Sequence, residues 1–192
     1  MRKLVLASTS PFRQQILRKL NIDFDIADPQ VSENRFDNET PQQLVSRLSE
    51  AKARAVAVRY PDALIIGSDQ VAVLDNNILG KPLHHENARH QLSLASGKKI
   101  TFYTGLCLFN SATANSQVSC VLFNVYFRTL NENQIEHYLQ TDKPYNCAGS
   151  FKSEGFGISL FEKLEGDDPN TLIGLPLIEL IRLLANEGVY IP

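Results

Sequence analysis

This sequence has few cysteines, no tryptophan and no excess of positive charge. Its 192 residues include 3 cysteines and no tryptophan, and 19 Lys+Arg against 21 Asp+Glu give a net charge of −2. Cys107, Cys120 and Cys147 are odd in number and lack Cys-x-x-Cys spacing, which fits neither a disulfide framework nor a zinc site. Nucleic acids and anionic membranes both attract a basic excess, so the charge balance predicts neither as a partner.

Long hydrophobic runs are absent too. The apolar runs end well short of the roughly 20 residues that span a bilayer, and residues 1–7 lead at once into polar residues. We therefore expect no transmembrane helix, no signal peptide, and a cytoplasmic protein with reduced cysteines. Walker, GxGxxG, HExxH and GxSxG motifs are also missing, which removes the commonest NTPase, dinucleotide, zinc-protease and hydrolase sites.

The chain that remains has an ordinary globular composition, with 43% hydrophobic and 21% charged residues, and its length fits one domain with one lobe or two. Hydrophobic periodicity predicts helices after Ser10 and Thr40 and over residues 85–96, 131–139 and 176–186. Apolar runs predict strands over residues 4–7, 21–27, 63–74, 99–110, 117–129 and 158–164. Because antiparallel strands dominate the middle, we expect an α/β protein with a mixed sheet.

A polar triplet interrupts the most apolar of the predicted strands. Ser68, Asp69 and Gln70 directly follow two isoleucines and a glycine. An unpaired buried carboxylate is costly, so Asp69 either faces water at a strand end or is exposed in a cleft. In a cleft it would act as a general base or a metal ligand.

The segment from Ser8 to Arg13 joins a predicted strand to a predicted helix start. Ser10 suits the N-cap and Pro11 the first turn, and the free N–H groups of such a start bind anions. Arg13 shares the helical spacing of the apolar residues after it, which places it on the inward face. It is either paired to a structural carboxylate or a clamp for phosphate, which guanidinium binds in a bidentate way.

Other charged residues carry no signal of their own. Lys52 borders the apolar stripe of its predicted helix, and Lys81 follows a predicted hairpin turn. Each lysine alone is typical of a surface, and Glu33 and Glu154 stand in loops where solvated acids are common. The residues alone therefore indicate an α/β protein with an anion site.

A series of short motifs runs in order through nearly the whole chain. It begins with LASTSPFR at residues 6–13 and continues through Glu33 and residues 50–53, 67–71, 80–82, 127–128, 148–151 and 174–176. This series resembles the Maf family of nucleoside triphosphate pyrophosphatases. The resemblance implies an elongated mixed sheet flanked by helices, with two lobes around a central cleft in one domain over residues 1–192. It also implies hydrolysis between the α- and β-phosphates, a divalent metal and a homodimer.

The resemblance assigns roles to individual residues. Asp69 falls on the proposed catalytic base. The polar residues of the family's cleft match Ser8, Ser10, Arg13, Glu33, Lys52 and Lys81. Arg13, Lys52, Lys81 and the helix start would hold the triphosphate. Glu33 and Asp69 are the candidate ligands for Mg²⁺ or Mn²⁺.

Branches of the family differ in substrate. At three positions the dTTP/UTP branch typically has Arg, Thr and Gln. This chain has Phe12, Gln70 and Glu154 there, and it resembles the branch that prefers 7-methyl-GTP. The 7-methylguanine ring is cationic, so it would stack on Phe12, and the Glu154 carboxylate would accept its N1–H and N2–H₂. Gln70 would shape the same pocket. Taken alone, Phe12 also fits a helix-start core residue, and Glu154 a solvated loop acid.

The leading hypothesis is thus an enzyme that removes 7-methyl-GTP and so keeps a modified nucleotide out of nucleic acids. Alternatives are a less selective pyrophosphatase and a nucleotide-binding regulator of cell division, because the family is associated with inhibited septum formation. A pure binder has no use for Asp69, whose charge would repel a triphosphate.

Overall fold

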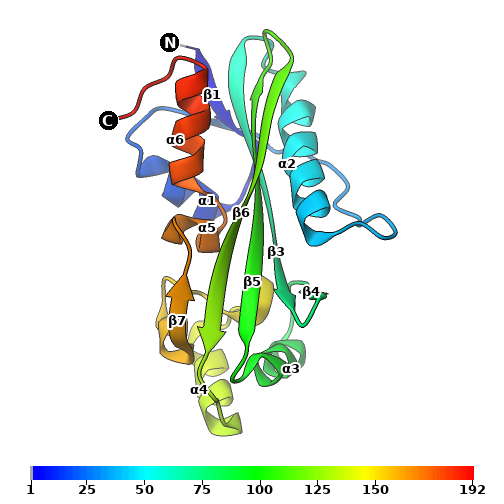
Figure 1. Cartoon of the computed structure of the whole chain (residues 1–192), viewed down its shortest axis with the longest axis vertical. Coiled ribbons are helices and arrows are strands. Elements are labelled where there is room, and N and C mark those ends of the chain that lie inside the picture. The colour runs from blue at the N-terminus through cyan, green and yellow to red at the C-terminus, as the bar shows by residue number, and fades with distance from the viewer. Residues whose placement is uncertain (1) are drawn as a thin grey trace. The chain divides into compact units, whose positions relative to one another are not determined.

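The structure is a computed structural model that describes residues 2–192. Its strands form a seven-stranded sheet in the order β2-β1-β3-β5-β6-β7, with β4 paired to β3. Figure 1 labels the strands, which are β1 (Lys3–Leu6), β2 (Asp25–Ile26), β3 (Ala63–Leu74), β4 (Asn77–Leu79), β5 (Lys99–Asn110), β6 (Asn115–Phe127) and β7 (Phe161–Glu165). The α-helices are α1 (Pro11–Arg18), α2 (Pro41–Ala57), α3 (His85–Ala95), α4 (Glu132–Asp142), α5 (Pro169–Ile173) and α6 (Leu177–Asn186). The expected α/β fold with a mixed sheet is confirmed, because β1 pairs in parallel with β2 and β3 while β4 and β7 pair antiparallel.

The chain forms two compact units. Unit 1 comprises Met1–Gln70, Thr104–Val121 and Asp168–Pro192, and unit 2 comprises Val71–Tyr103 and Leu122–Asp167. The long strands β3, β5 and β6 contribute residues to both.

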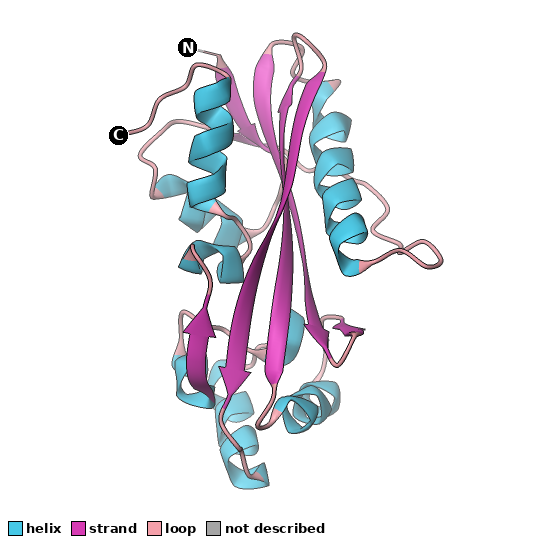
Figure 2. Cartoon of the chain, viewed as in Figure 1, coloured by secondary structure: helices cyan, strands magenta, loops and turns pink. Residues whose placement is uncertain are grey.

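Unit 1 has one hydrophobic cluster on each face of its strands. Alternate strand residues point to opposite faces, and the clusters divide by this rule. Even-numbered strand residues, Leu4, Leu6, Leu64, Ile66, Leu106 and Leu108, pack with apolar residues of α1 and α6. Odd-numbered ones, Val5, Ile65, Cys107 and Phe109, pack with Ala53 and Val56 of α2. Figure 2 accordingly shows α2 on one side of these strands and α1 with α6 on the other.

The first two helices of unit 1 begin where the sequence predicts. The Arg13 N–H donates to Ser10 Oγ (3.4 Å), and Pro11 occupies the first turn of α1. Thr40 and Gln43 form a capping box at the start of α2, with reciprocal hydrogen bonds of 3.2 and 2.9 Å. These caps fix the register of Arg13 and Lys52 along their helices.

Unit 2 is built around an aromatic cluster. The Phe151 ring packs edge-on against Phe102, Phe127 and Phe161, with centroid distances of 5.5, 5.5 and 4.8 Å. Helix α3 packs against α4 and against a short 3₁₀ helix, Ala148–Ser150. Such edge-to-face contacts stabilise a core beyond the area that they bury.

Some sequence predictions about elements were wrong. The strand expected over residues 21–27 is reduced to Asp25–Ile26, which pair with Val5 and Leu6 of β1. Asn21 takes a left-handed conformation at φ 50°, which a strand residue does not adopt. Residues 158–160 belong to a 3₁₀ helix, Phe156–Leu160, in which Ser159 Oγ donates to the Phe156 carbonyl at 2.8 Å. Helix α5 was not predicted, because its five residues are too few to show a helical period.

Within residues 2–192, no helix combines the length and the apolar character that crossing a membrane requires.

Candidate active site

The candidate site of unit 1 lies where β1 ends beside β3. The parallel register of these strands runs to the pair Leu6–Ile66, and the Ala7 N–H then donates to the Ile66 carbonyl (2.8 Å). After β1 the chain turns into α1 and leads to β2 on one side, whereas β3 lies on the other side of β1. Open α/β sheets bind ligands at the carboxyl ends of strands where connections diverge in this way. Ser8 and Asp69 are both placed at this end.

The polar triplet on β3 serves both faces of the sheet. Side chains alternate between the two faces along a strand, so Ser68 and Gln70 lie on the same face as Ile66, which packs against α1 and α6. Asp69 lies on the opposite face, together with Ile65, and this face packs against α2. Neighbouring residues of one strand therefore act in different places, with Asp69 directed toward Lys52.

Asp69, Lys52 and Glu33 form the charged centre of the site. Lys52 Nζ lies 2.6 Å from Asp69 Oδ1 and 2.6 Å from Glu33 Oε1. The Lys52 side chain is 6% exposed and that of Asp69 11%, whereas that of Glu33 is 57% exposed. The surface position that Lys52 suggests by itself is thus wrong, and the Asp69 carboxylate is buried with a cationic partner, as a buried charge requires.

A partly buried ion pair holds the loop that carries Glu33. Arg47 of α2 donates to both carboxylate oxygens of Glu39, from Nε to Oε1 (2.6 Å) and from Nη2 to Oε2 (2.8 Å). The same Nη2 donates to the Asn34 carbonyl (3.0 Å), next to Glu33. The Arg47 hydrogen bonds hold the pKa of Glu39 below its usual range, so this anchor stays charged at neutral pH. It ties Glu33 to the helix that carries Lys52.

Gly67 lets α2 approach β3 closely enough for Lys52 to reach Asp69. A Cβ atom on Gly67 would lie 2.0 Å from the Ser49 carbonyl oxygen and 3.0 Å from the Ala53 nitrogen. Real Cβ atoms do not come this close to backbone, so only glycine fits here. Ser49 and Ala53 flank Lys52 on α2, which makes this close approach part of the site.

The start of α1 contributes hydroxyl and N–H groups. Ser8 is buried, and its Oγ accepts from the Ser10 N–H at 3.2 Å. Ser10 Oγ in turn caps Arg13 N–H (3.4 Å). The Ser8 hydroxyl thus keeps its proton for another acceptor. Binding of an anion at this helix start stays a prediction.

Arg13 is fixed by a backbone carbonyl. Its Nε donates to the Gly174 oxygen (2.9 Å), which also accepts from Ser68 Oγ (2.9 Å). Among residues 2–192 this is the only hydrogen bond of the guanidinium, so Nη1 and Nη2 remain for a ligand. Burial lowers the pKa of Arg13, and the charges of Asp69 and Glu33 oppose this effect, which leaves the group protonated. The structural ion pair considered for Arg13 is replaced by a carbonyl anchor.

Gln70 and Phe12 differ in how firmly they are held. Gln70 Nε2 lies 2.9 Å from Thr104 Oγ1 and 2.8 and 3.2 Å from the Thr171 and Leu172 carbonyl oxygens. Its amide nitrogen is therefore committed to α5. Phe12 is half-buried in the first turn of α1.

Lys81 and Glu154 belong to unit 2, where both lie near Cys147. Burial raises the pKa of the Cys147 thiol, Glu154 raises it further, and Lys152 and Lys81 oppose the rise. Lys81 and Glu154 are themselves exposed. Unit 2 therefore brings together a cation and a carboxylate that stand 73 positions apart in the sequence, by the difference of their numbers.

The residues present fit a divalent cation that also binds the substrate. Glu33 and Asp69 each place one oxygen within 2.6 Å of the same point, now held by Lys52 Nζ. No cluster of three or more His, Cys, Asp or Glu side chains suited to a metal occurs within residues 2–192. Mg²⁺ commonly takes one or two carboxylates and completes its shell with phosphate oxygens and water.

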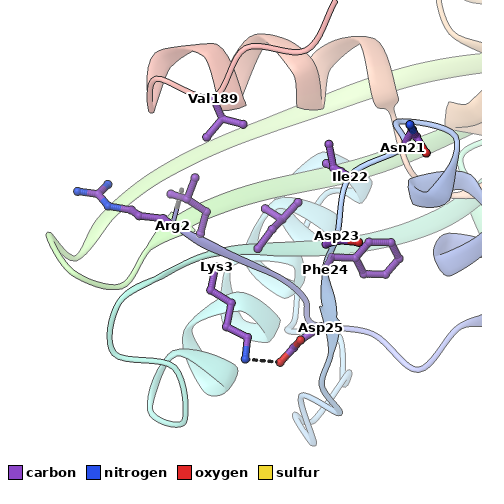
Figure 3. A pocket seen from close by; sticks show the side chains of 10 residues that line it. Arg2, Lys3, Asn21, Ile22, Asp23, Phe24, Asp25 and Val189 are labelled. Atoms are coloured by element: carbon purple, nitrogen blue, oxygen red, sulfur yellow. Dashed lines mark ion pairs between the residues drawn. The ribbon is translucent and has the colours of Figure 1, made fainter.

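A pocket of about 560 Å³ at the other ends of β1 and β3 does not suit a polyphosphate. Its cations are already matched by acids. Lys3 Nζ lies 2.7 Å from Asp25 (Figure 3). Arg2 lies 3.6 Å from Glu187. A triphosphate needs cations that are free to bind it. We therefore assign no role to this pocket.

Sequence reasoning assigned no role in the site to Thr104, Thr171 or Gly174, although Gly174 belongs to the motif at residues 174–176. Each acts largely through a backbone carbonyl or a supporting hydroxyl, and such groups leave no composition signal. The Asp168-Pro169 pair, an N-cap followed by a first-turn proline, is the one signal that would have located α5.

Comparison with known proteins points to one family. A family model described as Maf-like protein matches residues 3–187. A 7-methyl-GTP pyrophosphatase of Alcanivorax borkumensis is 58% identical over 189 residues, which cover 98% of this chain and 96% of that protein. A 7-methyl-GTP pyrophosphatase of Aliivibrio fischeri is 57% identical over 187 residues, 97% of each chain.

Solved structures support the fold. A Ham1 protein of Staphylococcus aureus matches with a TM-score of 0.56 at 11% identity, over 97% of this chain and 99% of that one. A HAM1 protein of Coxiella burnetii matches with a TM-score of 0.52 at 11% identity, over 97% and 100%. At this identity the likeness concerns the fold alone.

Proposed function

Because this chain belongs to the Maf family, we propose that it hydrolyses 7-methyl-GTP between the α- and β-phosphates, which yields 7-methyl-GMP and pyrophosphate. One observation carries the proposal, the buried Asp69 carboxylate held 2.6 Å from Lys52 at the end of β1. Full-length relatives at 57% and 58% identity are named for this substrate. The cell would thereby be cleared of a modified nucleotide.

Asp69 acts as general base in this proposal. It takes a proton from water as the water oxygen bonds to phosphorus and the P–O bond of the α–β bridge breaks. Pyrophosphate leaves with the electron pair of that bond. Arg13 Nη groups, the Ser8 hydroxyl and Lys52 Nζ donate to phosphate oxygens, whose charge grows in the transition state. Lys52 holds Asp69 and Glu33 in place before the nucleotide arrives.

Glu33 and Asp69 would hold Mg²⁺ or Mn²⁺ in the complex with nucleotide, since their oxygens converge on one point. Such an ion supplies charge neutralisation for the phosphate oxygens. The homodimer and the cytoplasmic location that the family resemblance implies stay predictions. Sedimentation of the purified protein would test the first of them.

Glu154 is proposed to select the methylated base. Its exposed carboxylate can accept two guanine N–H groups and favours a cationic ring. Glu154→Gln keeps the shape and removes the charge, so we expect the ratio of kcat/KM for 7-methyl-GTP over GTP to fall about tenfold, as for loss of about 1.4 kcal/mol. Steady-state kinetics with both nucleotides measures this ratio.

Glu162→Gln is a matched control, because Glu162 is another exposed acid of unit 2. It should leave the ratio unchanged. An unchanged ratio in Glu154→Gln as well would refute the charge argument and leave pocket shape as the source of selectivity.

Phe12→Ala should raise KM for 7-methyl-GTP, because stacking of a base on an aromatic ring contributes about 1–3 kcal/mol.

Arg13, Lys52 and Lys81 are proposed to bind the triphosphate tail that all substrates share. Arg13→Ala, Lys52→Ala and Lys81→Ala should each lower kcat/KM for 7-methyl-GTP and GTP by the same factor, about 10- to 100-fold for a charged hydrogen bond. Lys99→Ala removes an exposed lysine and serves as control. A strong change in base preference would show that the substituted residue contacts the base.

A further inference from the structure

One backbone carbonyl orients the guanidinium of Arg13. The Gly174 oxygen accepts from Arg13 Nε and from Ser68 Oγ, each at 2.9 Å. Both lone pairs of this carbonyl are therefore used, and the guanidinium is anchored on the edge that carries Nε. A shift of the Gly174 carbonyl would therefore shift the anchor of the Arg13 guanidinium.

The direction of that carbonyl depends on an unusual backbone conformation. Gly174 has φ +114° and ψ 16°, and its N–H ends α5 by donating to the Asn170 and Thr171 carbonyls. A residue with a Cβ atom is strained at this φ. Helix α5 has only five residues, too few to hold this geometry by itself.

Asp168 holds the segment from both sides. Its Oδ1 accepts from the Asn170 N–H (2.8 Å), which caps α5, and its Oδ2 accepts from the Ile178 N–H (2.9 Å) in the first turn of α6. The side chain is buried, with the residue 2% exposed. One carboxylate thus caps two helix starts, one before and one after Gly174, and fixes the distance between them.

Gln70 holds the same segment on its other side. Its Nε2 lies 2.8 Å from the Thr171 carbonyl oxygen and 3.2 Å from that of Leu172, in the last turn of α5. The Thr171 carbonyl also accepts from the Gly174 N–H (3.0 Å) and from Thr104 Oγ1 (3.1 Å). The α5 turn is therefore held between Asp168 and the β3 strand that carries Asp69.

We propose that Asp168 is a positioning residue for Arg13, which acts by fixing the Gly174 carbonyl and thereby the guanidinium that binds the triphosphate. Asp168 itself contacts no substrate in this account. The inference rests on the proposed function only in giving Arg13 a polyphosphate to bind.

Asp168→Asn tests the inference most cleanly. Asparagine is an excellent N-cap, so α5 remains capped, but an amide offers one oxygen where the carboxylate offered two. The tie to α6 is therefore lost while the fold is retained. Asp167→Asn is the matched control, because it removes the same charge from the adjacent, exposed position.

The measurement is a double-mutant cycle with Arg13→Ala. We expect Asp168→Asn to lower kcat/KM for 7-methyl-GTP about tenfold or more, since a misplacement of about 1 Å can cost roughly 100-fold. In the Arg13→Ala background the same substitution should change kcat/KM less than twofold. The shift in Tm caused by Asp168→Asn should be equal in both backgrounds. Asp168→Ala should reduce activity further than Asp168→Asn.

The same double-mutant cycle can be measured in binding. Calorimetry without divalent metal gives the affinity of each variant for inorganic tripolyphosphate, which does not depend on hydrolysis of 7-methyl-GTP. Coupling in this binding, with no pyrophosphate released by the wild type, would contradict the proposed function and keep the inference. Equal losses caused by Asp168→Asn in both backgrounds would show a merely structural role and overturn it. No loss in either background would overturn it too.

Discussion

Asp69→Asn is expected to lower kcat for 7-methyl-GTP by at least about 100-fold, within the roughly 10²–10⁴-fold range for loss of a general base. Asparagine keeps the shape of the side chain, and its Oδ1 can still accept from Lys52. It has no basic oxygen that can take a proton from water. Pyrophosphate release under saturating nucleotide measures the loss.

The matched control is Asp62→Asn, which changes an exposed aspartate just before β3 and should leave kcat unchanged. Circular dichroism and thermal melting should show that Asp69→Asn retains the fold. Near-normal turnover in this variant would rule out Asp69 as the base and would direct attention to Glu33, the other carboxylate on Lys52.

Gly67→Ala should strongly destabilise the protein and separate Lys52 from Asp69. The new methyl group would lie 2.0 Å from the Ser49 carbonyl oxygen, so α2 has to move away from β3. Overpacking of a closely packed site costs about 1–3 kcal/mol and occasionally more. For a chain of this size each kcal/mol lowers Tm by about 2–4 °C.

Gly80→Ala is the matched control, because a Cβ atom there meets nothing within 4 Å and φ is not positive. Urea unfolding of both variants measures the difference. Equal stability of Gly67→Ala and the wild type would show that α2 does not contact β3 as closely as the structure has it. In that case the link between Lys52 and Asp69 would need another explanation.

The strand β3, which carries Asp69, could be predicted from the sequence. The residues that contact the polar side chains of β3 could not. The limits of β3 and β5 and the caps of α1 and α2 follow from local patterns, because apolar runs and capping residues act over a few positions. The burial of Lys52 follows from the close approach of α2 at Gly67, a contact between distant segments. No local pattern contains that information.

The α5 turn shows the same limit more clearly. The sequence around Asp168 is typical of an ordinary N-cap. Its second hydrogen bond, from the Ile178 N–H, depends on how α5 and α6 pack together. Arg13 was expected to meet a carboxylate or a phosphate, and its structural partner is the Gly174 carbonyl. Backbone groups are present at every position, so a sequence cannot mark the one that matters.

Product analysis of the purified protein with 7-methyl-GTP and Mn²⁺ tests the central claim most directly. We expect 7-methyl-GMP and pyrophosphate in equal amounts, and kcat/KM higher for 7-methyl-GTP than for GTP under the same conditions. Formation of 7-methyl-GDP and orthophosphate, absence of turnover, or equal kcat/KM for the two nucleotides would contradict the account.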